Sequence, residues 1–266
     1  MNQMLADVKE MLHEQVEYHE LFWQMTKRDL LLRYKQTIMG FGWAIFMPVV
    51  NTIIFSVVFT RVARIDVGVP YPLFAFTGLL AWNFFASSLK FASVSLSSNA
   101  SLVSKVYFPR EVFPVSQVIV CLVDAMIASV VVVAMMAWYG LAPGVTAVWV
   151  PVILLVHVAL TTAVALLLAM CNLFFRDVKY LTDIVLSVAM FSTTALYPAS
   201  LVGGRAGWLI AHNPLSLIID AYRDALLFHR MPMTPTFAAL AVFCLSLLAV
   251  SWLLFHRAEY RFAESV

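Results

Sequence analysis

Long apolar runs recur along the 266 residues of this chain and restrict the folds open to it. Six stretches are rich in Leu, Val, Ile, Ala and Phe and carry few charges: residues 39–60, 71–92, 113–139, 149–175, 180–201 and 237–255. A helix of about 20 apolar residues matches a hydrocarbon core of about 30 Å. With 62% hydrophobic and 12% charged residues, the chain is too apolar for a soluble domain. We therefore predict an all-α integral membrane protein with six transmembrane helices.

The charges between these runs predict how the chain is oriented. If six helices cross, most of the 17 Lys and Arg residues fall on the side that holds both termini. Positively charged segments are retained in the cytoplasm, so we predict that both termini are cytoplasmic. Residues 1–37 carry charges of both signs on a helical apolar pattern, which is typical of an amphipathic arm lying along the interface. Residues 38–266 then form one six-span membrane domain.

A polar and basic segment, residues 98–114, separates the second apolar run from the third. Leu102, Val106 and Tyr107 recur at helical spacing, while Asn99 and Lys105 lie on the other face. The prolines that follow end this short helix, because proline cannot continue the hydrogen-bond ladder. An amphipathic helix between two spans can contact the bilayer, its own bundle or a soluble partner, and the pattern alone leaves these alternatives open.

Residues 203–228 differ from the apolar runs. Glycines open this segment, Asn213 and Pro214 break it, and Asp220 and Arg223 interrupt its second half. Its apolar pieces are too short to span and too polar to face lipid, so we predict a re-entrant hairpin between the fifth and sixth spans. Asp220 and Arg223 share a helical face. They could form a salt-bridged surface or hold a gate, and the spacing does not decide between the two.

The sequence lacks the motifs of several kinds of chemistry. It has no Gly-Lys pair, so it cannot form the glycine-rich loop that binds ATP phosphates, and it has neither H-E-x-x-H nor G-x-S-x-G. Cys121, Cys171 and Cys244 lie inside apolar runs, which indicates packing rather than disulfides. A net charge of +2 is too small to indicate nucleic acid. We expect no catalytic site, no metal site and no cofactor bound by this chain.

Asp124 lies near the middle of the third apolar run, about 16 Å from its start. A carboxylate at that depth costs about 2.5–3.5 kcal/mol on insertion scales. We therefore expect Asp124 to face protein or water and to have a partner. It could make a polar contact within the bundle or between two copies, or it could belong to a substrate site.

Four blocks of the sequence resemble the permease subunits of bacterial ABC-type polysaccharide exporters, which include the O-antigen, capsule and teichoic-acid exporters. In chain order they are Arg28-Asp29-Leu30 with Arg33-Tyr34-Lys35 and Gly40-x-x-Trp43, then Asn99–Pro114, then Asn172-Leu173-x-x-Arg176-Asp177-Val178, then Tyr197-Pro198 with Asn213-Pro214-Leu215 and Asp220-x-x-Arg223. Ile38-Met39 stands where the family usually has an aliphatic-Leu pair, which is a mild departure.

This resemblance implies a function. The chain would be the membrane subunit of an exporter that moves a lipid-linked polysaccharide, O-antigen- or capsule-like, from cytoplasm to periplasm across the bacterial inner membrane. Two copies of the chain would assemble as a homodimer with two copies of an ATP-binding subunit, which would hold the ATP and Mg. Residues 99–111 would be a coupling helix docked on that ATPase, through Asn99, Leu102, Lys105, Val106, Tyr107, Phe108, Pro109, Arg110 and Glu111.

Charge and depth suggest one role for residues outside the coupling segment, and the resemblance implies another. The cations at the cytoplasmic headgroup level would attract the phosphate of a lipid head where the substrate enters: Arg28, Arg33, Lys35 and Arg176, with Tyr34 beside them. Asn213, Pro214, Asp220 and Arg223 would form a periplasmic gate.

Candidates for a translocation path are less distinct. Most aromatic residues of a membrane protein face lipid or the interface, but flat rings also suit contact with sugar faces. The candidate path residues are Trp43, Phe46, Trp82, Phe85, Asp124 and Tyr197. Two alternatives stay open: an exporter of the same architecture for a lipid or a drug, and an integral-membrane lipid-phosphate transferase. The transferase is less favoured because its Asp and His residues would need to cluster, and here they are scattered.

Overall fold

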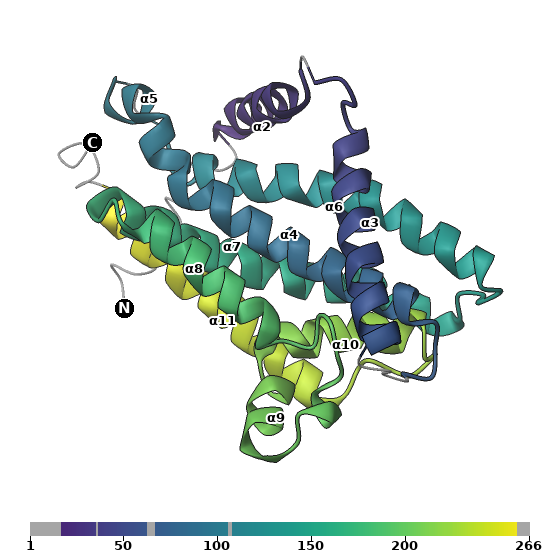
Figure 1. The fold of residues 1–266 in the computed structure, drawn as a ribbon. Coiled ribbons are helices and arrows are strands. Elements are labelled where there is room, and N and C mark those ends of the chain that lie inside the picture. The colour runs from purple at the N-terminus through teal and green to yellow at the C-terminus, as the bar shows by residue number, and fades with distance from the viewer. Residues whose placement is uncertain (1–16, 36, 63–66, 106–107, 260–266) are drawn as a thin grey trace.

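The computed structural model describes residues 17–35, 37–62, 67–105 and 108–259, all of them in helices, turns and connecting segments (Figure 1). The helices are α2 (His19–Tyr34), α3 (Gly42–Val57), α4 (Tyr71–Ser98), α5 (Ala100–Lys105), α6 (Val112–Trp138), α7 (Val150–Phe174), α8 (Val178–Phe191), α9 (Gly204–Ala211), α10 (Pro214–Leu226) and α11 (Pro235–Ala258). Short helical turns adjoin them at η1 (Val58–Val62), η2 (Val145–Trp149) and η3 (Ala199–Leu201). The prediction of an all-α fold is confirmed for these residues.

Five helices of the described residues are long and apolar enough to cross a membrane. They are Gly42–Thr60, Tyr71–Ser98, Val112–Trp138, Val145–Phe174 and Pro235–Ala258. Each coincides with one of the predicted runs, because length and hydropathy are local properties of the sequence. The chain is therefore a multi-pass membrane protein.

The fifth predicted span, residues 180–201, is not a continuous helix. Helix α8 stops at Phe191 after 14 residues, a length of about 21 Å that falls short of a hydrocarbon core of about 30 Å. Hydroxyl groups compete with the helical ladder at this point. Thr193 donates to the carbonyl of Met190 at 3.0 Å, and the amide N–H of Thr194 donates to the hydroxyl of Ser216 at 3.1 Å.

The chain nevertheless passes from one end of the bundle to the other between α7 and α11. These two helices run in the same direction, because Ile153 and Phe237 near their starts share one hydrophobic cluster, and Leu173 and Phe255 near their ends share another. Residues 175–234 must therefore lead back along the bundle. Helix α8, which packs against α4 and α7, covers part of that distance, and residues 192–198 continue it.

Helix α4 is the centre of the bundle and packs against α3, α6, α7, α8 and α10. Its side chains Leu73, Phe76 and Leu96 are fully buried. Helix α3 is the opposite case, since Thr52 is its one buried residue and large apolar side chains such as Met47 and Ile53 are exposed. This surface of α3 requires lipid or another apolar surface to cover it.

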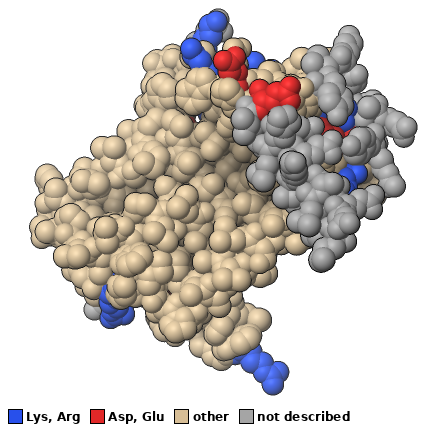
Figure 2. Space-filling model, turned by 180° about the vertical axis from the view of Figure 1, so that it is seen from behind, with Lys and Arg blue, Asp and Glu red and all other residues tan. Residues whose placement is uncertain are grey.

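Exposed Lys and Arg side chains gather toward the two ends of the bundle. Figure 2 shows charged side chains at the top, at the upper right and at two places near the bottom, with a broad uncharged face between. Exposed Lys27, Lys179 and Arg257 belong to the end formed by α2, the start of α8 and the end of α11. Exposed Arg205 and Arg230 belong to the opposite end, near α9 and α10. An uncharged band between charged ends is what a bilayer requires.

A glycine in α4 allows the close approach of the segment that follows α8. A Cβ atom at Gly78 would lie 2.2 Å from Nη2 of Arg223 and 2.3 Å from the carbonyl oxygen of Ala195. We expect Gly78→Ala to destabilise the protein by about 1–3 kcal/mol, the usual cost of overpacking. The matched control is Gly42→Ala, whose Cβ would meet ordinary contacts at 3.5 Å. Thermal unfolding of both variants in detergent, followed by intrinsic fluorescence, tests this, and equal melting temperatures would contradict it.

Candidate functional site

Helices α2, α3, α4 and α6 enclose a cavity of about 760 Å³ at the end of the bundle where α2 lies. Its polar lining includes Arg28, Arg33 and Tyr34 from α2, Asn99 at the end of α4, and Asp124 from α6. Leu32, Trp43 and Phe91 add apolar surface. The cavity thus combines cations and hydrogen-bonding groups with apolar walls, and we take it as the candidate site.

A smaller cavity of about 210 Å³ continues from the first one along α3, α4 and α6. The two share Trp43, Ser87 and Asp124. The smaller cavity adds Asn51 of α3 and Asn83 of α4. Amide groups within apolar runs are a signal that the sequence offered and that our sequence analysis missed. Together the two cavities form a trough with polar groups that leads from the α2 end into the bundle.

Asp124 lies where the two cavities meet, and both of its carboxylate oxygens are hydrogen-bonded. Nη1 of Arg33 donates to one oxygen and forms a salt bridge with it, and the hydroxyl of Tyr34 donates to the other. Asp124 is twelve residues, about 18 Å, from the start of α6. The expectation that a carboxylate at this depth needs a partner is confirmed, and the partners come from the interfacial helix.

Arg33 is held by more than its salt bridge. Its guanidinium lies 4.1 Å from the centroid of the Phe91 ring, and Nη1 lies 3.5 Å from the sulfur of Cys121. Its side chain is 19% exposed and that of Asp124 is 22% exposed, so the pair forms part of the cavity wall. Burial and the hydrogen bond to Asp124 raise the pKa of Tyr34, so its phenol stays protonated and acts as a donor.

Polar contacts also attach the middle of α2 to α4 and α6. Nη2 of Arg28 donates to Asp29 at 2.8 Å and to the side-chain oxygen of Asn99 at 3.0 Å. The second carboxylate oxygen of Asp29 accepts from Ser116 at 3.2 Å and from Gln117 at 2.6 Å. Helix α2 is thereby fixed to the two helices that flank α5.

The other two cations predicted for this site lie at the same end of the bundle but apart from the cavity. Lys35 is exposed at the C-cap of α2, and Arg176 is exposed in the turn between α7 and α8. The structure therefore brings together Arg28, Arg33 and Tyr34, and it leaves Lys35 and Arg176 outside the group.

Comparison with known proteins identifies the family. The family model described as ABC-2 type transporter matches residues 20–227, which is most of the chain. The chain belongs to the ABC-2 type transporter family. A Klebsiella pneumoniae protein named O-antigen export system permease protein RfbA is 31% identical over 242 residues, covering 90% of this chain and 92% of the relative. A Myxococcus xanthus protein of the same name is 29% identical over 258 residues, covering 96% and 99%.

The predicted coupling segment of this ABC-2 permease falls into an outer and an inner part. The outer part contains Asn99 and α5, which ends at Lys105 at one corner of the molecule in Figure 1. Leu102 of α5 packs against the hydrophobic cluster that contains Phe108 and Phe113. Val106 and Tyr107 lie outside the described residues.

The inner part of the segment packs into the bundle. Phe108 is 4% exposed and packs against Phe113, with ring centroids 5.4 Å apart and the rings tilted by 60°, and Pro109 is buried next to it in the chain. Arg110 donates through its backbone N–H to the Glu259 carboxylate at 2.9 Å, and Trp252 donates to buried Glu111 at 3.2 Å. Phe108, Arg110 and Glu111 therefore attach the coupling segment to the bundle.

Glu259 and Trp252 of the α11 region hold the coupling segment, and sequence reasoning missed both. They lie about 140 to 150 positions from their partners, so no local motif could have indicated them.

The candidate path residues separate into different environments. Trp43 and Asp124 line both cavities of the trough. Phe46 is 45% exposed on α3 and meets the edge of the Trp43 ring. Trp82 and Phe85 pack in the central hydrophobic cluster, and Tyr197 is half-buried with its hydroxyl donating to the carbonyl of Phe191.

The predicted gate segment contains a buried arginine. Arg223 of α10 donates to the carbonyl oxygens of Phe74 at 3.1 Å, Thr194 at 2.5 Å and Ala195 at 2.8 Å, and it lies 3.4 Å from a carboxylate oxygen of Asp220. The Arg223 side chain is 2% exposed. The alternative of a solvated salt-bridged surface is therefore wrong for Arg223, because its donors pair the carbonyls left open where α8 ends.

Asn213 and Pro214 begin the same helix. The Asn213 side chain accepts from the N–H of Leu215 at 3.0 Å and donates to the carbonyl of Ser192 at 3.2 Å. Pro214 occupies the first helical position, where its missing N–H costs nothing. The start of α10 is thus tied to the turn after α8.

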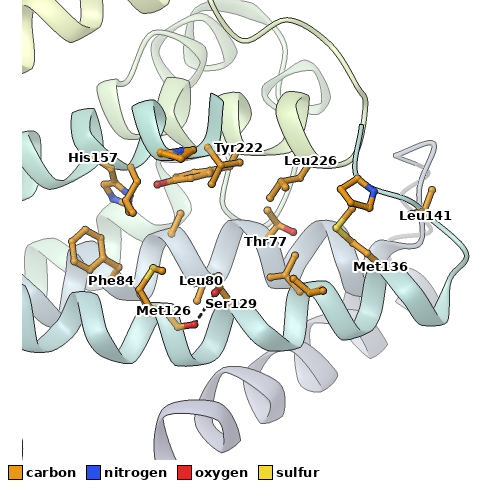
Figure 3. Close-up of a pocket in the computed structure, with 18 of the residues that line it drawn as sticks. Thr77, Leu80, Phe84, Met126, Ser129, Met136, Leu141, His157, Tyr222 and Leu226 are labelled. Carbon is orange, nitrogen blue, oxygen red and sulfur yellow. Dashed lines mark hydrogen bonds between the residues drawn. The ribbon is translucent and has the colours of Figure 1, made fainter. Parts of the chain in front are cut away.

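A third cavity, of about 810 Å³, lies on another face of the permease, between α4, α6, α7 and α10. Figure 3 shows Met126 and Met136 of α6 opposite Tyr222 and Leu226 of α10. Its lining is largely apolar and contains no Lys, Arg, Asp or Glu among the described residues. For an anionic substrate the first cavity, which Arg28 and Arg33 of α2 line, is the better candidate, and we call it the cavity under α2.

We expect Arg223→Gln to destabilise the permease strongly. Each buried carbonyl left unpaired costs about 1–3 kcal/mol, and a shorter amide cannot reach the carbonyls of both α4 and the turn after α8. The matched control is Arg205→Gln, which removes an exposed cation from the same end of the bundle. Thermal unfolding in detergent measures both variants. An equal effect of the two substitutions would show that the Arg223 contacts do not support the fold.

Proposed function

We propose that this chain is the membrane subunit of an exporter that moves a lipid-linked polysaccharide, O-antigen- or capsule-like, from the cytoplasm to the periplasm. The observation that carries the proposal is the cavity under α2, where Arg28 and Arg33 face a trough of polar and aromatic side chains. The names of the relatives support a glycan cargo. Cations suit the phosphate of a lipid head, and amides with aromatic rings suit uncharged sugars.

The proposal places the α2 end of the bundle in the cytoplasm, with both termini on that side. The exposed cations of α2, of the start of α8 and of the end of α11 support this orientation. The count of six crossings is kept, with α8 and residues 192–198 making the fifth in two pieces. Arg223 supports such a broken crossing, because it pairs backbone carbonyls that a continuous helix would satisfy internally.

Two copies of the chain would together form the translocation path. Helix α3 forms one wall of the trough, yet exposes Ile53 and Ile54, which do not line it. Apolar residues on a helix with so little buried surface suit a subunit interface within the membrane. The proposed assembly is a homodimer, and each copy binds one ATP-binding subunit, which holds the ATP and Mg.

Motion of the ATPase would reach the cavity through α5. This helix joins α4 to α6, and Arg28–Asn99 and Asp29–Gln117 connect both to α2. The Arg110–Glu259 contact extends the connection to α11. A displacement of α5 would therefore move α2, which covers the cavity, together with α4, α6 and α11 as one body.

A lipid or drug exporter is the second candidate function. The apolar cavity between α4, α6, α7 and α10 favours it, because a cavity of about 810 Å³ with methionine and leucine walls suits an apolar molecule. Reconstituted complex distinguishes the candidates, because ATP hydrolysis would respond to a lipid-linked oligosaccharide in one case and to the lipid or drug alone in the other.

Removing cations from the cavity is expected to reduce export. We expect the double variant Arg28→Ala, Arg33→Ala to lower surface polysaccharide at least about tenfold, the effect of losing charge-assisted contacts to a phosphate. The ATPase should still co-purify, because α5 is unchanged. The measurement is immunoblotting of surface glycan in cells that lack their own permease. Arg205→Ala is the control, and unchanged export in the double variant would refute the role of the cavity.

A charge in the outer coupling segment is expected to separate ATP hydrolysis from export. Tyr107→Glu places a carboxylate where the resemblance implies contact with the ATPase, so export should fall while hydrolysis by the purified complex continues. The control is Thr236→Glu, because Thr236 is exposed at the start of α11, at the end of the bundle away from α5. If the complex carrying Tyr107→Glu exports normally, the coupling assignment is wrong.

A further inference from the structure

We propose that Asp124 is an internal counter-anion, which binds Arg33 and Tyr34 while the cavity is empty and releases both when the phosphate of a lipid-linked substrate enters. This inference rests on the proposed function, since it deepens the role of the cavity under α2. The ligand class is a lipid phosphate or diphosphate. The exchange replaces one set of ion-pair and hydrogen-bond contacts by another, and no covalent bond or proton is moved.

The geometry places the exchange at the junction of the two cavities. Asp124 lines both of them, and its two oxygens accept from two consecutive residues at the end of α2. A ligand bound near Arg33 would therefore meet the same two donors that Asp124 now holds.

A second arginine in the same protein shows how a permanent anchor differs from this arrangement. Arg223 is 2% exposed and donates to three backbone carbonyls, which cannot leave. Arg33 is 19% exposed, and its acceptors in the described part of the chain are one carboxylate and one sulfur, both on side chains. The Arg33–Asp124 pair is thus reachable from the cavity, and its partner can be replaced.

The chemistry of the two donors suits a phosphate at least as well as a carboxylate. A guanidinium presents a planar fork that binds two phosphate oxygens at once, and a phenol can donate to a third. The Phe91 ring and the Cys121 sulfur do not compete for the ligand, because neither is an anion. The released carboxylate would face the trough, where Ser87 and Asn83 offer polar groups.

The exchange would free one end of α2 and leave the other in place. Asp29 stays bound to Ser116 and Gln117, so the middle of α2 remains on α6. The released end leads into α3, and the Tyr34 ring lies 4.3 Å from that of Phe41, centroid to centroid. Loading of the substrate would in this way reach α3, the wall of the trough.

Binding of farnesyl diphosphate to the full chain in nanodiscs tests the inference. We expect Asp124→Asn to bind it about tenfold more tightly than the wild-type chain, because the variant removes the competing charge. Asp183→Asn is the matched control. It also removes one negative charge at the α2 end, where Asp183 pairs with Lys90 at 2.9 Å, and it should leave the affinity unchanged. Inorganic diphosphate and farnesol, used as further ligands, distinguish a free phosphate site from a lipid-head site.

The outcomes separate the two proposals. If neither the wild-type chain nor Asp124→Asn binds farnesyl diphosphate, the role of the cavity in the proposed function fails. If the wild-type chain binds it and Asp124→Asn binds equally or more weakly, the cavity stands and the counter-anion inference fails.

Hydrogen exchange on the unmodified chain gives a second test that does not depend on the folding of a variant. Farnesyl diphosphate should increase amide exchange at residues 30–35 and leave residues 20–28 unchanged. Exchange at residues 30–35 that stays the same or slows would overturn the inference.

Discussion

A polar group inside hydrocarbon must find its partner within the protein, and two arginines meet this requirement here. Arg223 pairs the carbonyls that become free where α8 ends, so the chain can break a helix without exposing its backbone to lipid. Arg33 pairs with the carboxylate of Asp124, which would otherwise lie alone in a span. The Arg223 contacts hold the segment after α8 against α4, and the Arg33–Asp124 pair, together with Tyr34, anchors the end of α2 on α6.

The two arginines differ in how accessible their side chains and partners are. Arg223 is sealed by α4, α10 and the turn after α8, and Gly78 leaves the space for it. Arg33 stands at the wall of a cavity and pairs with Asp124, which lines the same cavity. Arg223 is thus a buried arginine that supports the fold through backbone carbonyls. The Arg33–Asp124 pair is accessible and suits a site for a charged ligand.

Much of this architecture was open to prediction from the sequence. The five long helices follow from runs of apolar residues, and the break in residues 203–228 follows from its glycines and prolines. Arg28, Arg33 and Tyr34 were predicted as a group and line one cavity. The fifth span was predicted as continuous because hydropathy averages over Thr193 and Thr194, whereas the helix ends where the Thr193 hydroxyl bonds back to Met190 and the Thr194 amide bonds to Ser216 of α10.

The sequence by itself determined which segments are apolar enough to leave water, because the transfer of each residue into hydrocarbon is nearly independent of distant residues. It also determined that Asp124 needs a partner. Only the tertiary structure decided that the partners are Arg33 and Tyr34, about 90 positions away, and that Glu259 holds Arg110. Such pairs depend on which helix faces meet, and that is set by the packing of the whole bundle rather than by any local pattern.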